Sequence, residues 1–158
     1  MDLILNKLFP ESANNDFRGY KIALWGFIAF TLLMTWRSII HMLFEQYGFH
    51  EIANFSMITG DPDPMILIYR FFSLWGFAQL IFCFVCWVVI FRYRALIPLM
   101  YLLWLFEWSF RTFGYPLIRE DITIQGIYTL SATPGAVGAP YVTFFLIILF
   151  SLSLRQKK

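Results

Sequence analysis

The sequence predicts an all-α integral membrane protein, a four-helix bundle whose N- and C-termini both lie in the cytoplasm. Three observations predict this fold class: the composition is strongly apolar, four apolar stretches have the length of a membrane span, and Lys and Arg gather in alternate connections. Hydrophobic residues make up 59% of the 158 residues and charged residues 14%, against about 25% charged in soluble domains. A soluble domain of this size has too little interior to bury so much apolar surface.

Four stretches are long enough to cross the hydrocarbon layer, which takes about 20 residues at 1.5 Å per residue. A single transmembrane domain, residues 1–158, contains all four, and we predict the spans at about 20–44, 65–91, 95–115 and 137–154. The segment Met1–Phe9 before them lacks the features of a cleavable signal peptide. It is either a short interfacial helix or a frayed terminus.

Turn-forming residues separate the spans. Gly60–Pro64 contains two prolines and stops the chain before the second span, and Ala132–Ala136 breaks it before the fourth. Arg92–Arg94 leaves only a tight connection between spans two and three, so these helices are expected to be antiparallel neighbours. Residues Ile122–Leu130 alternate apolar and polar in part, which predicts a short extended segment on the outer face.

The distribution of basic residues predicts the orientation. The loop 45–64 has no Lys or Arg, whereas the two termini and the connection between spans two and three carry Lys7, Arg18, Lys21, Arg92, Arg94, Arg155, Lys157 and Lys158. Basic connections stay in the cytoplasm, so we predict a multi-pass protein of a bacterial-type plasma (inner) membrane.

Five ionisable residues fall inside the predicted spans: Arg37, His41, Arg70, Glu107 and Arg111. A charged side chain at the centre of a span costs about 2.5–3.5 kcal/mol on insertion scales. At 1.5 Å per residue, Arg37, Glu107 and Arg111 lie about 25, 18 and 24 Å from the cytoplasmic end, and Arg70 lies about 7–8 Å from the outer end. We therefore expect three helices to bring charge to one level in the outer half of the membrane.

The spacing of these residues favours pairing. Glu107 and Arg111 are four residues apart on one helix face, and Trp104 and Trp108 flank them. Two interpretations remain open: the cluster fixes the bundle, with some arginines reaching towards head groups, or it lines an outward-opening pocket. Three arginines against one carboxylate favour a polar or anionic ligand in such a pocket, for example a lipid head group or an anionic small molecule.

Other chemical motifs are weak. Cys83 and Cys86 form a C-x-x-C pair, but the pair lies near the cytoplasmic side and has no second cysteine pair, so two buried structural thiols are the better interpretation. His41 and His50 do not complete a zinc site, and we predict no metal, no cofactor and no catalytic residue. The net charge of +2 without a basic stripe argues against nucleic acid as a partner.

Two segments carry a resemblance to a known group of proteins. These are Tyr69–Gly76, and Arg92–Tyr101 followed by Glu107 and Arg111. An Arg early in span two, a short basic hairpin, and an acid with an Arg late in span three resemble the small bacterial four-helix membrane families around DoxX, over about Met65 to Arg111. The resemblance implies the fold and one recurrent cluster of Arg70, Glu107 and Arg111, and it implies no substrate.

Three functional hypotheses follow. The first is a non-enzymatic accessory subunit or binding module, whose partners are membrane lipids, an anionic ligand, a second copy of the chain or a larger membrane complex. The second is a homo-oligomeric channel or transporter, because a lone four-helix bundle has little room for a pore. The third is a membrane oxidoreductase, which the missing redox pair disfavours.

Overall fold

The computed structural model describes residues 2–118 and 128–155, and within these ranges all named elements are helices, joined by loops and without a strand. The all-α prediction is therefore confirmed. The helical segments are α1 (Asp2–Leu8), α2 (Lys21–Leu43), α3 (Glu45–Tyr47), the π-helical η1 (Gly48–Ile52), α4 (Met65–Arg92), the 3₁₀ turn η2 (Arg94–Leu96), α5 (Ile97–Ser109), the π-helical η3 (Phe110–Gly114), α6 (Tyr115–Ile118) and α8 (Pro134–Leu154).

Three of these helices, α2, α4 and α8, are long and apolar enough to cross a membrane, which indicates a membrane protein. They correspond to the first, second and fourth predicted spans. The predicted third span, 95–115, is divided instead: α5 has 13 residues, and η3 and α6 continue it to Ile118. The surface of the long helices is rich in exposed large apolar side chains, such as Trp25, Phe84 and Tyr141, as expected for helices in contact with lipid.

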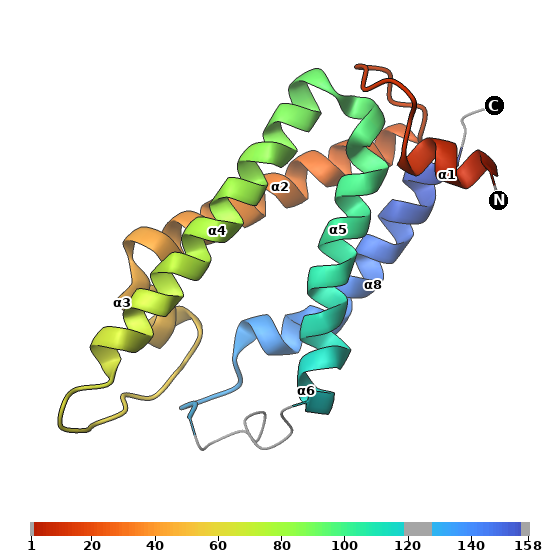
Figure 1. Cartoon of the computed structure of the whole chain (residues 1–158). Helices are drawn as coiled ribbons and strands as arrows, with labels where there is room; N and C mark the ends of the chain where they lie inside the picture. Colours follow the sequence, from red (N-terminus) through yellow and green to blue (C-terminus); the bar gives the residue numbers. More distant parts are fainter. Residues whose placement is uncertain (1, 119–127, 156–158) are drawn as a thin grey trace.

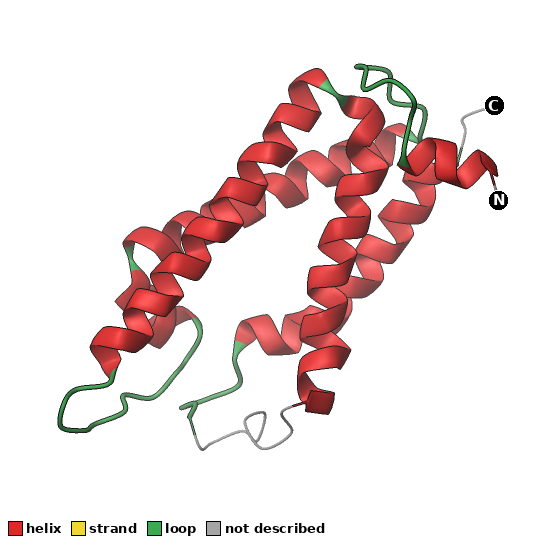
Figure 2. Ribbon diagram, viewed as in Figure 1, coloured by secondary structure: helices red, strands yellow, loops and turns green. Residues whose placement is uncertain are grey.

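The helices form two antiparallel pairs, α2 with α4 and α5 with α8 (Figure 1). The loops lie at the two ends of the bundle (Figure 2). From the short turn that joins them, α4 and α5 run apart (Figure 1). The two pairs are therefore close at one end and separate towards the other.

Both chain termini lie at the end where the pairs meet (Figure 1). The Lys7 ammonium donates to the Leu154 carbonyl oxygen at 2.5 Å, and the Tyr20 backbone N–H donates to the Leu152 carbonyl at 3.2 Å. The segment Met1–Phe9 is thus helical from Asp2 to Leu8 and is tied to the end of α8.

The main core lies near this end, where all four long segments contribute side chains. Phe27 and Met34 of α2 pack with Tyr101 and Trp104 of α5 and with Leu146 of α8, and each of these side chains is almost fully buried. The Tyr101 hydroxyl donates to the Ala23 carbonyl oxygen at 2.7 Å. This bond satisfies a buried hydroxyl and joins α5 to α2.

The opposite end is closed by loops. The chain between α2 and α4 meets the chain before α8 through a β-bridge between Phe55 and Thr129. Two backbone bonds support it: Ser56 N–H to the Tyr128 carbonyl at 2.9 Å and Leu130 N–H to the Asn54 carbonyl at 2.8 Å. Most of the predicted extended segment, Ile122–Leu130, lies outside the described residues, and its last part forms this bridge.

Candidate functional site: a polar cluster between the helix pairs

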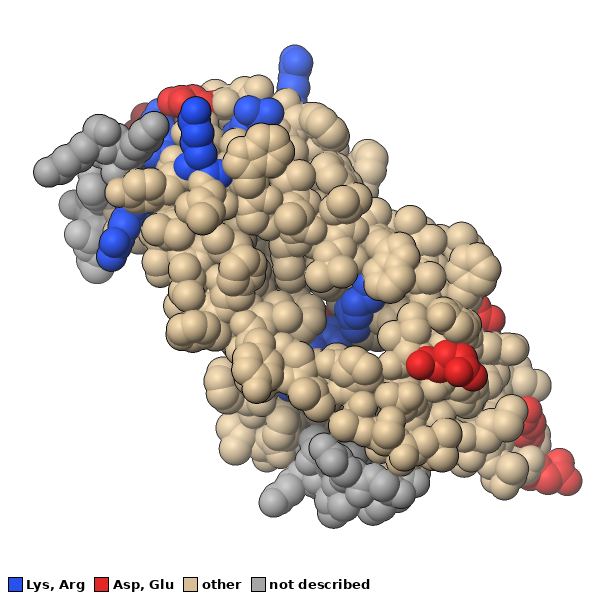
Figure 3. All heavy atoms as spheres, turned by 180° about the vertical axis from the view of Figure 1, so that it is seen from behind, with Lys and Arg blue, Asp and Glu red and all other residues tan. Residues whose placement is uncertain are grey.

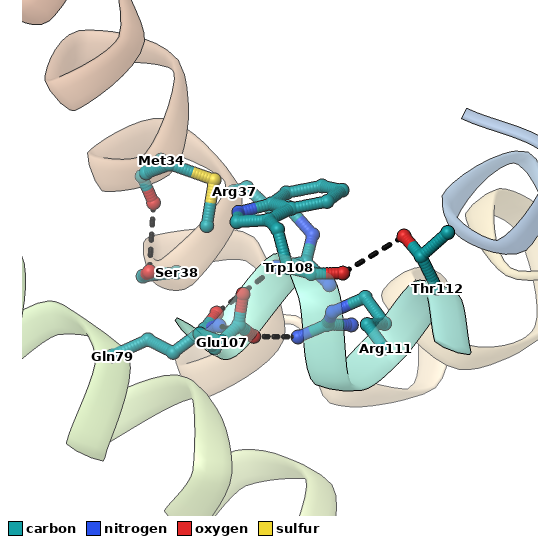
Figure 4. Close-up of polar contacts among 8 residues, drawn as sticks. All are labelled: Met34, Arg37, Ser38, Gln79, Glu107, Trp108, Arg111 and Thr112. Atoms are coloured by element: carbon teal, nitrogen blue, oxygen red, sulfur yellow. Dashed lines mark hydrogen bonds and ion pairs between the residues drawn. The ribbon is translucent and has the colours of Figure 1, made fainter. Parts of the chain in front are cut away.

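A chain of polar contacts crosses from α2 through α4 to α5 at the level where the helix pairs separate. The Arg37 guanidinium (Nη1) donates to the Gln79 side-chain oxygen at 3.0 Å, and the Gln79 amide nitrogen donates to Glu107 Oε1 at 3.2 Å. Arg111 Nη2 donates to the same carboxylate oxygen in an i,i+4 ion pair. We call Arg37, Gln79, Glu107 and Arg111 the polar cluster; Figure 4 shows them converging from α2, α4 and the helix formed by α5 and η3.

An indole ring connects the two arginines. The guanidinium carbon of Arg37 lies 4.9 Å from the centroid of the Trp75 ring, and that of Arg111 lies 5.0 Å from the same centroid. Arg111 also lies 5.3 Å from the ring of Trp108. Cation–π attraction lowers the cost of holding two like charges close together in a nonpolar environment.

His41 lies beside the polar cluster rather than within its hydrogen bonds. Its ring is buried, stacked on Trp75 at 4.9 Å and tilted against Phe72 at 4.5 Å. Trp104, the other predicted flanking aromatic residue, is fully buried between Phe30 and Phe82. Arg37, Glu107, Arg111 and Trp108 therefore lie together with His41 beside them, whereas Trp104 lies in the core.

Arg70 lies elsewhere. It is exposed on α4, and no contact joins it to the polar cluster in the part of the chain that the structure describes. Arg70 and Gln79 are nine residues apart, which places their side chains about half a turn apart around the helix and about 13 Å apart along it. The buried face of α4 carries Gln79, so Arg70 points away from the bundle.

A π-helical turn sets the position of Arg111. The segment η3 (Phe110–Gly114) follows α5 directly, so the helix widens one residue beyond the end of α5. Such turns are rare and frequently mark functional sites. Within it, the Thr112 hydroxyl lies 2.9 Å from the Thr143 hydroxyl of α8 and also donates to the Trp108 carbonyl oxygen at 2.8 Å, which fixes the turn against α8.

Gln79 and Trp75 were not predicted as site residues. Both are uncharged and stand in an apolar helix, so a search for charged groups misses them. One signal was present: Gly76, Gln79, Cys83 and Cys86 follow each other at spacings of three and four residues, which places the small and polar residues of α4 on one face. That face is the buried one.

The polar cluster carries one positive charge in excess, since two guanidinium groups face one carboxylate. It is also partly open: the Glu107 and Arg111 side chains are 31% and 24% exposed. Figure 3 shows Lys and Arg atoms recessed in a hollow partway along the molecule, between surfaces of uncharged residues. Glu107 Oε2 is itself buried and without a hydrogen-bond partner among the described residues.

The remaining chemical motifs lie outside this cluster. Cys83 and Cys86, called the thiol pair below, are free and buried, and Ser38 lies 4.0 Å from the Cys83 sulfur. Within the described residues no group of three or more His, Cys, Asp and Glu could hold a metal ion. His50 instead organises the loop between α2 and α4: its Nδ1 donates to the Phe55 carbonyl at 2.8 Å, and its Nε2 bonds the Tyr69 hydroxyl.

The fold and the site define a helical membrane protein with a charged, partly open cluster between its helices. Comparisons of the chain with protein-family models, with curated proteins and with solved structures gave no match.

Proposed function

We propose that the chain is a four-span protein of the inner membrane with both termini in the cytoplasm. The β-bridge between Phe55 and Thr129 supports a membrane crossing by the third predicted span, 95–115, which brings the number of spans to four. Phe55 lies between α2 and α4, on the side opposite the termini, and Thr129 lies on the same side as Phe55. Because the turn before α5 lies at the terminal end, the chain has to cross between residues 96 and 129, and α5, η3 and α6 together extend for about 30 Å.

Charge supports the orientation. In Figure 3, Lys and Arg gather, together with some Asp and Glu, at the end of the molecule that holds the termini, whereas the charged residues seen at the opposite end are Asp and Glu. The basic end is expected to face the cytoplasm.

Cysteine labelling tests this topology. In a Cys83→Ala, Cys86→Ala background, Ser131→Cys is expected to react with a membrane-impermeant maleimide on intact cells. Ser12→Cys and Tyr93→Cys are expected to react only after permeabilisation. If Ser131→Cys behaves like Ser12→Cys, the segment 97–118 does not cross the membrane.

Within this topology we infer that the protein is a non-enzymatic binding module that holds an anionic ligand at the polar cluster. The observation that carries this proposal is the convergence of Arg37 and Arg111 on one indole ring with a single carboxylate between them. An unbalanced charge in a span is costly, and a bound anion removes the imbalance. Guanidinium groups also bind planar oxyanions through two parallel hydrogen bonds.

Ligand-dependent stability tests this function. The purified protein would be heated with a panel of carboxylate and phosphate anions, both water-soluble and lipid-like, against chloride at equal ionic strength. A ligand at 100 times its Kd stabilises the folded state by about 2.7 kcal/mol. The stabilisation is expected to disappear in Arg37→Gln and Arg111→Gln and to persist in Arg70→Gln, a matched control that removes the same charge from the exposed face of α4. An equal loss of ligand-dependent stabilisation in all three variants would refute the assignment of the ligand site to the polar cluster.

A second role, fixing the bundle, is favoured by Gln79. Its amide accepts from Arg37 and donates to Glu107, so it joins α2 to α5 through α4. Gln79→Leu removes both bonds and leaves the charge excess unchanged. If the cluster only fixes the bundle, this variant loses stability and no anion restores it; if it binds a ligand, anion-dependent stabilisation remains.

The resemblance to the families around DoxX is consistent with this proposal in its four spans and in the pairing of Glu107 with Arg111. The position of Arg70 does not agree with the resemblance. The resemblance implies that Arg70 belongs to the cluster of Glu107 and Arg111, whereas Arg70 lies on the exposed face of α4.

A further inference from the structure

We propose that the ligand of the polar cluster is a membrane-resident monoanion, a singly charged oxyanion on a hydrocarbon tail, that enters sideways from the bilayer. This inference rests on the proposed function and names its ligand class. The oxyanion is a carboxylate or a phosphate diester, and it bridges Arg37 and Arg111 next to Trp75.

The charge of the cluster selects a monoanion. Arg37 and Arg111 contribute two positive charges and Glu107 one negative charge, so one further negative charge makes the site neutral. A dianion would leave an excess negative charge in the span, at the same kind of cost as the present positive one. Neutralisation by a single charge is therefore the most favourable occupancy.

Both arginines of the polar cluster have further N–H donors beyond the hydrogen bonds described above. A guanidinium group has five N–H donors. Among the described residues, Arg37 donates through Nη1 to Gln79, and Arg111 donates through Nη2 to Glu107. Both guanidinium carbons lie within 5.0 Å of one ring centroid, and we place the oxyanion between their remaining N–H groups. The buried indole N–H of Trp108 is a further donor without a partner among the described residues.

The depth of the cluster favours a ligand with an apolar tail. Gln79 lies about 21 Å along α4 from its outer end and about 20 Å from its inner end, at 1.5 Å per residue. A water-soluble anion would have to leave water and cross apolar surface to arrive there. An amphiphile already has its tail in the hydrocarbon layer and transfers only its head group.

The opening of the cluster provides a route for such a molecule. The hollow in Figure 3 holds Lys or Arg atoms and opens on the side of the bundle, between its charged ends. The Glu107–Arg111 pair is itself partly exposed. At the far end, the bridge between Phe55 and Thr129 joins the loops of the two helix pairs. Entry from the side therefore does not require this bridge to open.

Native mass spectrometry of the purified full-length chain tests the inference, with Kd measured for four probes. Oleate and phosphatidylglycerol represent the two sources of the oxyanion, methyl oleate keeps the tail without the charge, and acetate keeps the charge without the tail. Oleate, phosphatidylglycerol or both are expected to bind at least about tenfold more tightly than methyl oleate and acetate. Arg37→Gln and Arg111→Gln are expected to weaken this binding about tenfold or more, because each removes a charge-assisted hydrogen bond. Arg70→Gln is expected to bind as the wild type does.

The Glu107→Gln variant distinguishes a ligand-binding site from a cluster that only stabilises the bundle. The variant keeps the shape of the side chain and raises the positive excess from one charge to two, so it is expected to bind the anionic amphiphiles more tightly even where it lowers stability. Weaker binding in this variant would overturn the inference.

The failures of the two proposals are distinguishable. If acetate binds as tightly as oleate and both depend on Arg37 and Arg111, the cluster is an anion site and the amphiphile inference is wrong. If methyl oleate matches oleate, the tail alone is recognised, and the inference is again wrong. If no anion shows binding that the two arginine variants weaken, the proposed function fails as well.

Discussion

Gly76 lies where the backbones of α2 and α4 come close together, and its replacement by Ala gives a sharp test of the packing. A Cβ atom at this position would lie 2.7 Å from the Met42 backbone nitrogen and 2.8 Å from the His41 carbonyl carbon. Ordinary carbon contacts are about 3.5–4.0 Å, so the two backbones would have to separate by more than about half an ångström. Because the obstructing atoms are backbone, no side-chain rotation relieves the clash.

The expected change in the free energy of unfolding is estimated by comparing Gly76 with other glycines of the bundle. Gly138 has nothing within 4 Å of an added Cβ, so Gly138→Ala is expected to stabilise the protein by about 0.5–1 kcal/mol through the lost freedom of the unfolded chain. At Gly26 the added Cβ meets only the end of the Leu149 side chain, at 2.7 Å, which can rotate away. Overpacking typically costs about 1–3 kcal/mol, and we expect Gly76→Ala to be less stable than Gly138→Ala by about that amount.

The assay is reversible unfolding of the purified protein in mixed micelles by added SDS, with the free energy of unfolding compared among the three variants. Gly26→Ala is expected to lie between the other two. If Gly76→Ala is as stable as Gly138→Ala, the close approach of α2 and α4 is wrong, and with it the geometry that holds Arg37 against Gln79.

Three further outcomes are expected. Thr112→Val removes the hydroxyl contact with Thr143 that fixes η3 to α8, and a double-mutant cycle with Thr143→Val is expected to give a coupling of about 0.5–1.5 kcal/mol; a coupling near zero would contradict the contact. The thiol pair is expected to resist a membrane-impermeant maleimide in the folded protein and to react fully in SDS, as measured by mass spectrometry, because both sulfurs are buried. Tyr69→Phe removes the bond to His50 and is expected to lower the free energy of unfolding by about 1 kcal/mol; an unchanged melting temperature would show that this bond contributes nothing to stability.

The apolar helices could be predicted because their cause is local. A backbone in hydrocarbon has to satisfy its own hydrogen bonds, so a long apolar stretch becomes a helix whatever its neighbours do. Residues 65–91 were predicted as a span, and α4 extends from Met65 to Arg92. The division of the third predicted span was missed because a π-helical turn has no compositional signal: the Phe, Arg, Thr and Gly of Phe110–Gly114 also occur in regular helices.

The depth of the charged groups along their helices could be predicted from the sequence, but the helix face that each group occupies could not. Sequence number gives the depth of a residue along its helix, and Arg37, Glu107 and Arg111 were expected at one level and do meet. Which face a residue occupies depends on how the helix is rotated against its neighbours. The rotation of α4 is set by Gly76, whose missing side chain admits α2, and it turns Gln79 inward and Arg70 outward.

The neutral amide of Gln79 explains how the cluster combines a stable bundle with an unbalanced charge. An amide both accepts and donates, so one side chain satisfies the Arg37 donor on α2 and the Glu107 acceptor on α5 without adding charge. A carboxylate at this position would neutralise the second arginine but would stand beside Glu107 with no proton to share. A leucine would fill the space but leave Arg37 without its acceptor. Among side chains of this size, the amide alone joins the two helix pairs and keeps the positive excess, which is the property on which anion binding depends.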